Sequence, residues 1–206
     1  MDDDYRQAGC VRPGRGPRSD YFPNVVLLTH ENRRALFYDD LLRSRTVLIH
    51  FISTRDEDSR RLAMNLSRTQ SYLSGVQGRD VFLYSITRDP LHDHPARLEK
   101  FAAECVAQPG WLFLTGAEKA ISAVQARLYA SSGHIHGSQA AEDCSRGMFR
   151  YGNEAVGLWG SAPVGSDPEW IAQRLIWIRS RPEQPTAFVR RGPMLLTPPG
   201  PMGGVR

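Results

Sequence analysis

Three short apolar runs, each followed by a segment of helical periodicity, constrain the fold of this chain more than any other feature. Thr46–Ile52 is almost continuously apolar and rich in β-branched residues, residues 81–86 repeat that pattern, and Trp111–Gly116 supplies a third run. Continuous apolar strands are typical of a sheet that is covered on both faces. The sequence therefore predicts an α/β fold, in which helices flank a mixed sheet and right-handed crossovers connect its parallel strands.

Further elements are predicted on either side of these strands. Residues 24–29 read as a short strand, and "RALFYDDLL" reads as a strand that runs into a helical turn. Leucines at helical spacing predict an amphipathic helix over residues 58–74. The segment "GMFRYGNEAVGLW" predicts a late β-hairpin that turns at Gly152 and Asn153, and a last helix begins at "GSDPEW".

The distribution of charge divides the chain into a domain and two tails. Residues 19–178 hold 17 basic and 18 acidic side chains, so the net charge of +4 comes from the ends. We expect a flexible tail over 1–18, a folded domain over 19–180 and a Pro/Gly-rich tail over 181–206. A basic groove across the domain would indicate nucleic-acid binding, and the sequence predicts none. No apolar run approaches a membrane span and no secretory leader begins the chain, which predicts a cytoplasmic location for the chain as written.

Five segments resemble one known family, in the order in which that family carries them. They are "YFPNVVLLTHENRRALFYDDLL", "MNLSRTQ", "GRDVFLYSITRDPLHDHPARLEKFA", "GWLFLTG" and "MFRYGNEAVGLW". From about Tyr21 to Ile178 the chain resembles the Sco/SenC proteins, which are thioredoxin-like copper chaperones for cytochrome oxidase assembly. The resemblance implies a thioredoxin-like fold, copper as the metal, and a protein partner in respiratory or copper-site assembly. It also implies a periplasmic location if a leader has been removed.

The chain departs from the family at the residues that bind copper. The family carries a CxxxC pair in the loop after the central strand, and alignment through "MNLSRTQ" places those two positions on Arg55 and Ser59. The family's distant histidine falls on Cys144 or Ser145. A guanidinium has no free lone pair and repels a cation, and thiol–disulfide exchange requires a thiolate. We therefore expect a non-catalytic interaction or assembly protein that is not an enzyme and needs no cofactor.

A relocated metal site is the alternative that the sequence leaves open. His134 and His136 form a His-x-His pair that places both imidazoles on one side of an extended segment, and Cys144 follows eight residues later. Two imidazoles and one thiolate suit copper or zinc. The other interpretation is a flexible polar loop whose histidines are hydrated, and the residues lack a recognisable zinc ligand pattern.

Other polar residues have simpler interpretations beside their functional ones. The run Asp56-Glu57-Asp58 would either bind a hard cation or begin a helix, where carboxylates favour the positive end of the helix dipole. His92 and His94 would either join a shifted ligand set or face water, with Asp93 capping the next helix. A hydrogen-bonded histidine of the core is predicted for His50, and a core position for Cys105.

A thiol oxidoreductase is a third hypothesis. It would require Cys10 to reach Cys144 through the N-terminal tail, because the three cysteines form no CxxC or CxxxC pair. We rank this activity last.

Overall fold

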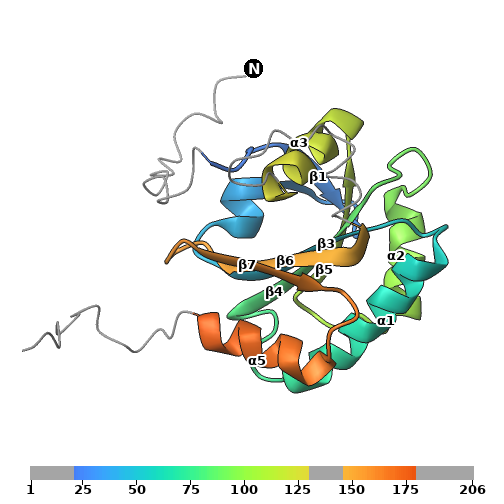
Figure 1. The fold of residues 1–206 in the computed structure, drawn as a ribbon. Helices are drawn as coiled ribbons and strands as arrows, with labels where there is room; N and C mark the ends of the chain where they lie inside the picture. The colour runs from blue at the N-terminus through green and yellow to red at the C-terminus, as the bar shows by residue number, and fades with distance from the viewer. Residues whose placement is uncertain (1–20, 130–145, 180–206) are drawn as a thin grey trace, which may run out of the picture.

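A seven-stranded sheet forms the centre of the fold in the computed structural model, which describes residues 21–129 and 146–179. The strand order is β2-β1-β5-β4-β3-β6-β7 (Figure 1). The strands are β1 (Val26–Thr29), β2 (Arg34–Leu36), β3 (Thr46–Ile52), β4 (Val81–Thr87), β5 (Trp111–Gly116), β6 (Met148–Asn153) and β7 (Leu158–Pro163). Both predicted tails, 1–18 and 181–206, lie outside the described residues.

The three apolar runs form the middle of the sheet, as predicted. β3 pairs with β4 and β4 with β5 in parallel, and every other pairing is antiparallel, so the sheet is mixed. Every residue of β3 is buried, which explains why its sequence is continuously apolar instead of alternating. The expected α/β architecture with a late hairpin is therefore confirmed.

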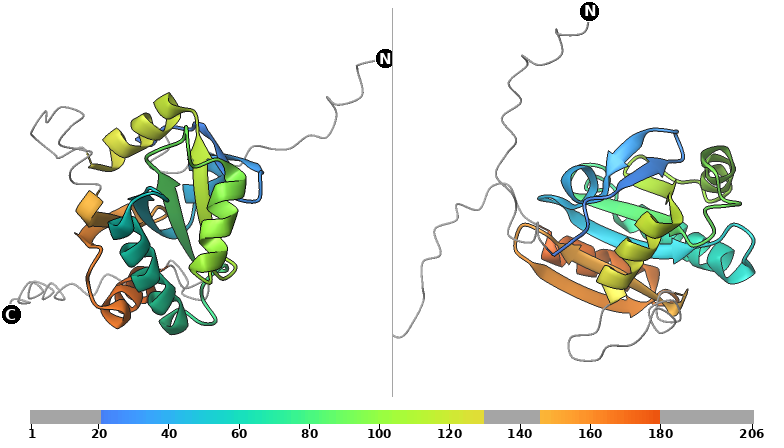
Figure 2. Two further views of the ribbon diagram at one scale, coloured as in Figure 1. Left: turned by 90° about the vertical axis from the view of Figure 1, so that its right-hand side faces the viewer. Right: turned by 90° about the horizontal axis from the view of Figure 1, so that it is seen from above.

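Helices cover both faces of the sheet (Figures 1 and 2). The helical elements are the π-helical turn η1 (Phe37–Leu42) and the α-helices α1 (Glu57–Tyr72), α2 (Pro95–Glu104), α3 (Glu118–Tyr129) and α5 (Pro168–Ile178). One face packs on α1, α2 and α5, and the other packs on η1 and α3. Among the described residues, no helix combines the length and the apolar composition that crossing a bilayer requires.

Two apolar cores result from this layering. On the α1/α2/α5 side, Leu48 and Ile52 of β3 join leucines and aromatics from the three helices. On the other side, Val47, Ile49 and Phe51 of the same strand meet η1 and α3. Alternate residues of β3 thus serve opposite cores, as strand geometry requires. Cys105 belongs to the first core and is 1% exposed, which confirms its predicted position.

The turn of the late hairpin differs from the prediction. Asn153 pairs with Leu158, so Gly152 and Asn153 belong to β6 and the turn occupies residues 154–157. An added Cβ on Gly152 would lie 2.4 Å from the ring of Trp159 on β7. The glycine is therefore required for close packing of Trp159 across the hairpin, and the expectation that it forms the turn was wrong.

The ends of β3 and β4 place two loops side by side. Because these strands are parallel and paired along their whole length, the loop after Ile52 and the loop after Thr87 leave the same edge of the sheet. The first loop leads into α1 and the second into α2, and both helices lie next to each other on one face (Figure 2). The candidate site lies at this edge.

Candidate functional site

Arg55 and Ser59, the positions that the resemblance assigns to the family's cysteines, lie in the loop after β3 and in the first turn of α1. Their environments differ sharply. Ser59 is 1% exposed, whereas the side chain of Arg55 is 54% exposed. The two side chains therefore do not form a common site.

The hydroxyl of Ser59 is fully used in hydrogen bonds within the protein. It donates to Oδ2 of Asp56 at 2.9 Å and accepts the backbone N–H of Ser53 at 3.0 Å. Nη2 of Arg88, at the end of β4, lies 3.4 Å from the same hydroxyl and donates to Oδ2 of Asp56 at 3.0 Å. Ser59 consequently has no lone pair directed to a metal ion.

Asp56 is the N-cap of α1, which confirms that the acidic run begins a helix. Its carboxylate accepts the backbone N–H of Asp58 at 3.2 Å, together with the Ser59 and Arg88 bonds. Burial raises the pKa of this carboxyl, but the hydrogen bonds from Ser59 and Asp58 and the charge of Arg88 outweigh it and lower the pKa. The carboxylate is committed to the helix terminus, so the hard-cation reading has no support.

Arg55 contacts the loop after β4. Its Nη1 lies 3.5 Å from Oδ2 of Asp89, and Nδ1 of His92 lies 2.8 Å from Oδ1 of the same carboxylate. The hydrogen bond from His92, followed by the charge of Arg55, lowers the pKa of Asp89 against the effect of burial. His92 and His94 are exposed, as one of the two sequence interpretations expects.

Asp93 connects the two loops and does not cap α2, so that expectation was wrong. Asp93 is fully buried and accepts hydrogen bonds from the hydroxyl and the backbone N–H of Thr54, the latter at 3.2 Å. It also accepts the hydroxyl of Thr87 at 2.6 Å. The N-cap of α2 is His94, whose side chain makes no capping bond, and Pro95 occupies the first helical position.

His50 lies in the core beneath this edge, as predicted. Its Nε2 is 2.5 Å from Oγ of Ser85 on β4, and the indole of Trp111 donates to the same oxygen at 2.8 Å. Burial and then the positive charge of Arg88 lower the pKa of His50 to about 3. The imidazole is therefore neutral at any physiological pH and serves as a polar member of the core.

The described residues contain no arrangement for soft-metal or thiol chemistry. Within residues 21–129 and 146–179, no group of three His, Cys, Asp or Glu side chains is placed to hold a metal ion. Cys105 is the cysteine of this part of the chain, and burial raises its pKa to about 11. A thiol with so high a pKa is protonated at neutral pH and is a poor nucleophile.

The predicted ligands His134, His136 and Cys144, and the alignment alternative Ser145, lie outside the described residues. The described residues on either side of that segment meet each other, since Oη of Tyr129 donates to the carbonyl of Met148 at 2.8 Å. The ring of Tyr129 also packs against Phe51 near the end of β3, with centroids 6.0 Å apart. Tyr129 and Met148 therefore lie at the same edge of the sheet as the loop of Arg55 and Ser59.

Sequence reasoning missed the residues that hold the site together, above all Arg88 and Thr54. A signal for Arg88 was present: it directly follows a buried strand that is parallel to β3, and the carboxyl ends of parallel strands meet at one edge. A cation at that position is placed to meet the carboxylates that begin α1.

Comparisons with known proteins define the class of fold to which this arrangement belongs. No protein-family model matches the chain, and no curated protein matches it. Solved structures do match, and those of the Sco proteins share its thioredoxin-like architecture. Copper-bound ScoI of Arabidopsis thaliana is 15% identical, with a TM-score of 0.55 over 74% of this chain and 93% of that chain.

Two further structures agree. A SCO1/SenC family lipoprotein from Bacillus anthracis is 14% identical, with a TM-score of 0.60 over 76% of this chain and 94% of that chain. BsSco, described as a member of the Sco family of cytochrome c oxidase assembly proteins, is 18% identical, with a TM-score of 0.59 over 75% and 90%. The chain therefore has the Sco/SenC fold, and the resemblance read from the sequence is confirmed at that level.

Proposed function

We propose that this chain is a non-catalytic interaction or assembly protein that uses the Sco/SenC fold without the family's copper and thiol chemistry. The observation that carries the proposal is the state of Ser59 and Arg55. Ser59 is buried and its hydroxyl is fully hydrogen-bonded, and Arg55 is paired with Asp89. Fold alone does not determine function, so these residues weigh more than the likeness of the fold.

The hydrogen bonds around the loop support a structural role for it. A working thiol or metal site needs an accessible donor atom, and here the side chains of Thr54, Asp56 and Ser59 are all engaged in hydrogen bonds within the protein. Asp56 caps α1, Ser59 closes the cap, and Arg88 joins both to β4. This arrangement stabilises the edge of the sheet in one conformation, as is expected of a surface that a partner recognises.

We infer that this surface binds a protein partner. One matched structure is of a cytochrome c oxidase assembly protein, and another was solved with copper bound. By analogy, we infer that this chain takes part in assembling a respiratory or copper-containing complex. Its contribution would be binding, with the thiol and copper steps performed by other proteins.

One observation favours a second candidate, a metallochaperone with a relocated site. Tyr129 and Met148, which lie on either side of the segment with His134, His136 and Cys144 in the sequence, are next to the end of β3. Two imidazoles and a thiolate on that segment would suit copper or zinc.

A copper competition experiment separates the two candidates. The reduced protein is titrated with Cu(I) against a chromogenic chelator, alongside Cys144→Ser and, as a control, Cys10→Ser. We expect the chelator to retain the metal in all three samples. Tight one-to-one binding that Cys144→Ser abolishes and Cys10→Ser preserves would overturn the interaction proposal in favour of the relocated site.

A further inference from the structure

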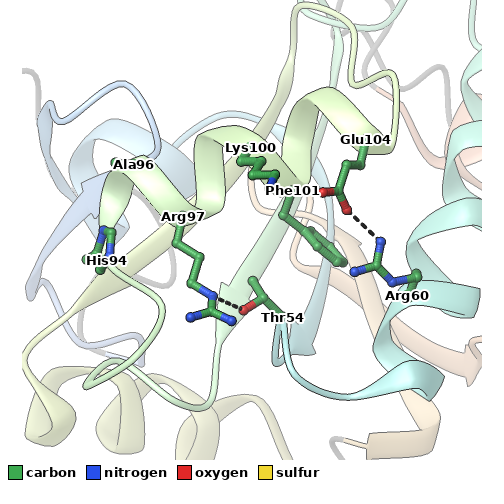
Figure 3. Close-up of a pocket in the computed structure, with 8 residues that line it drawn as sticks. All are labelled: Thr54, Arg60, His94, Ala96, Arg97, Lys100, Phe101 and Glu104. Carbon is green, nitrogen blue, oxygen red and sulfur yellow. Dashed lines mark hydrogen bonds and ion pairs between the residues drawn. The ribbon is translucent and has the colours of Figure 1, made fainter.

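A cavity of about 430 Å³ lies between α1, α2 and the loop after β3 (Figure 3). Its wall is formed mainly by α2, with one residue from the loop and one from α1. The lining residues are Thr54, Arg60, His94, Ala96, Arg97, Lys100, Phe101 and Glu104. The cavity is thus adjacent to the loop that replaces the family's cysteines, but its chemistry is different.

The charges of this cavity are not balanced. Its single carboxylate, Glu104, is paired with Arg60 at 2.5 Å. Arg97 and Lys100 meet no carboxylate among the described residues, and their spacing on α2 places them on the same helical face. Two positive charges therefore remain for an external anion.

The guanidinium of Arg97 is held in position before any ligand arrives. Its Nε donates to Oγ1 of Thr54 at 2.9 Å, as Figure 3 shows. Thr54 is itself bonded to the buried carboxylate of Asp93. This chain of bonds uses Nε of Arg97, and its two terminal nitrogens make no hydrogen bond among the described residues, so they remain to bind an oxyanion in a bidentate manner.

The cavity suits a group that projects from a larger molecule. His94, Ala96, Arg97 and Lys100 are all exposed, so a free small molecule would remain largely in solvent, unlike ligands in enclosed pockets. Phe101 is buried at the base, and Arg60 lies over its ring with 5.5 Å to the centroid. The site therefore combines a small apolar base with a cationic rim.

We propose that this cavity binds a carboxylate side chain from an acidic segment of a protein partner, through Arg97 and Lys100. The inference rests on the proposed interaction function and specifies the chemistry of the partner. The recognition surface would consist of α2 and the loop that contains Thr54, together with the side of α1 that faces α2.

The test uses the full chain and a fluorescein-labelled hexapeptide of glutamate. Binding is measured by fluorescence anisotropy for the wild type, for Arg97→Gln/Lys100→Gln, and for the control Arg33→Gln/Lys119→Gln. The control removes the same charge from exposed positions outside the cavity, on Arg33 before β2 and Lys119 in α3. It therefore corrects for attraction of the peptide to the basic tails.

We expect the cavity variant to bind about tenfold more weakly than the wild type, and the control to bind nearly as well. Glu104→Gln, which releases Arg60 from its ion pair, should bind about threefold more tightly. In amide spectra of the labelled protein, the peptide should shift Thr54, Ala96 and Lys100. The proposal would be overturned if both double variants lost the same amount of affinity for the peptide. It would also be overturned if the peptide shifted other amide signals but not those of Thr54, Ala96 and Lys100.

A second measurement adds inorganic phosphate to the peptide complex at matched ionic strength. We expect the phosphate to displace little of the peptide. If phosphate alone shifts the same amides and displaces the peptide at equal concentration, the cavity binds small anions and the assignment to a protein partner is wrong. Copper competition addresses the proposed function independently, so the failure of one measurement is distinguishable from the failure of the other.

Discussion

The guanidinium of Arg88 lies 3.0 Å from the carboxylate of Asp56, which joins the end of β4 to the N-cap of α1. Ser59, at a position that the resemblance assigns to a cysteine, lies within the same group of bonds. The positive charge that could have stabilised a thiolate there stabilises the cap of a helix instead.

Asp56→Ala is expected to lower the free energy of unfolding by about 1–2 kcal/mol, because it removes the N-cap and leaves Arg88 without this carboxylate. Asp58→Ala is the matched control. The Asp58 side chain is 81% exposed and, among the described residues, forms only a long ion pair with Arg61, so its removal should change stability by less than about 0.5 kcal/mol. Urea unfolding followed by circular dichroism measures both, and equal effects would contradict the assigned role of Asp56.

His50 should make the fold sensitive to mild acid. Its folded pKa is lowered to about 3, below the ordinary value of 6.5, so the unfolded chain binds more protons between these values. The stabilisation is therefore present above about pH 6.5 and is lost as pH falls toward 3. We expect the urea midpoint of the wild type to decrease between pH 7.5 and pH 5.

His50→Gln should show a smaller decrease over the same interval, because a glutamine does not titrate. The exposed His94 provides the control, and His94→Gln should keep the wild-type pH dependence. An unchanged slope in His50→Gln would show that the acid sensitivity arises from other groups.

Replacing both loop positions by cysteine tests whether the family alignment is correct. In a background with Cys10→Ser and Cys144→Ser, Arg55→Cys/Ser59→Cys should form an intramolecular disulfide with oxidised glutathione and release it with a reducing agent. The control Arg55→Cys/Ser71→Cys places the second thiol at the far end of α1, where it cannot reach the first.

Gel mobility after alkylation with a maleimide of high mass reports the number of free thiols in each variant. The oxidised loop variant should match the background protein, and the control should retain two additional reactive thiols. Equal modification of both variants would mean that positions 55 and 59 do not have the spacing of the family's pair.

Gly152→Ala should destabilise the late hairpin by about 3 kcal/mol, because the new methyl group would overlap the ring of Trp159 and crowd the carbonyl of Leu158. Gly165→Ala is the control, since an added Cβ there meets nothing within 4 Å. Thermal unfolding of the two variants gives the comparison, and similar melting temperatures would argue against the packing described for β6 and β7.

Sequence alone predicted the elements whose residues are buried on both sides. β3, β4 and β5 were recognised because a strand between two helical layers is apolar over most of its length. The hairpin turn was misplaced because Gly152-Asn153 has the composition of a tight turn, whereas its glycine is needed for contact with Trp159. A glycine that forms a turn and a glycine that allows close packing are identical in the sequence, and only the tertiary contacts distinguish them.

The candidate site was predictable in position but not in its bonding. Alignment placed Arg55 and Ser59 at the end of β3, and the expected loss of ligand chemistry follows from their side chains alone. The partners of the loop could not be read from the sequence, since Thr54 and Asp93 are 39 positions apart in the chain. Asp93 also resembles a helix cap, although Pro95 at the first helical position fixes the cap at His94.

The buried carboxylate of Asp93 has a consequence for the free energy with which a partner binds. By binding Thr54 and Thr87 at once, it prevents the loops after β3 and β4 from moving independently. A partner that docks on this edge meets a surface whose shape is set in advance, so little conformational entropy is lost on binding. Such a surface recognises its partner with few contacts, and its affinity depends on complementarity more than on rearrangement.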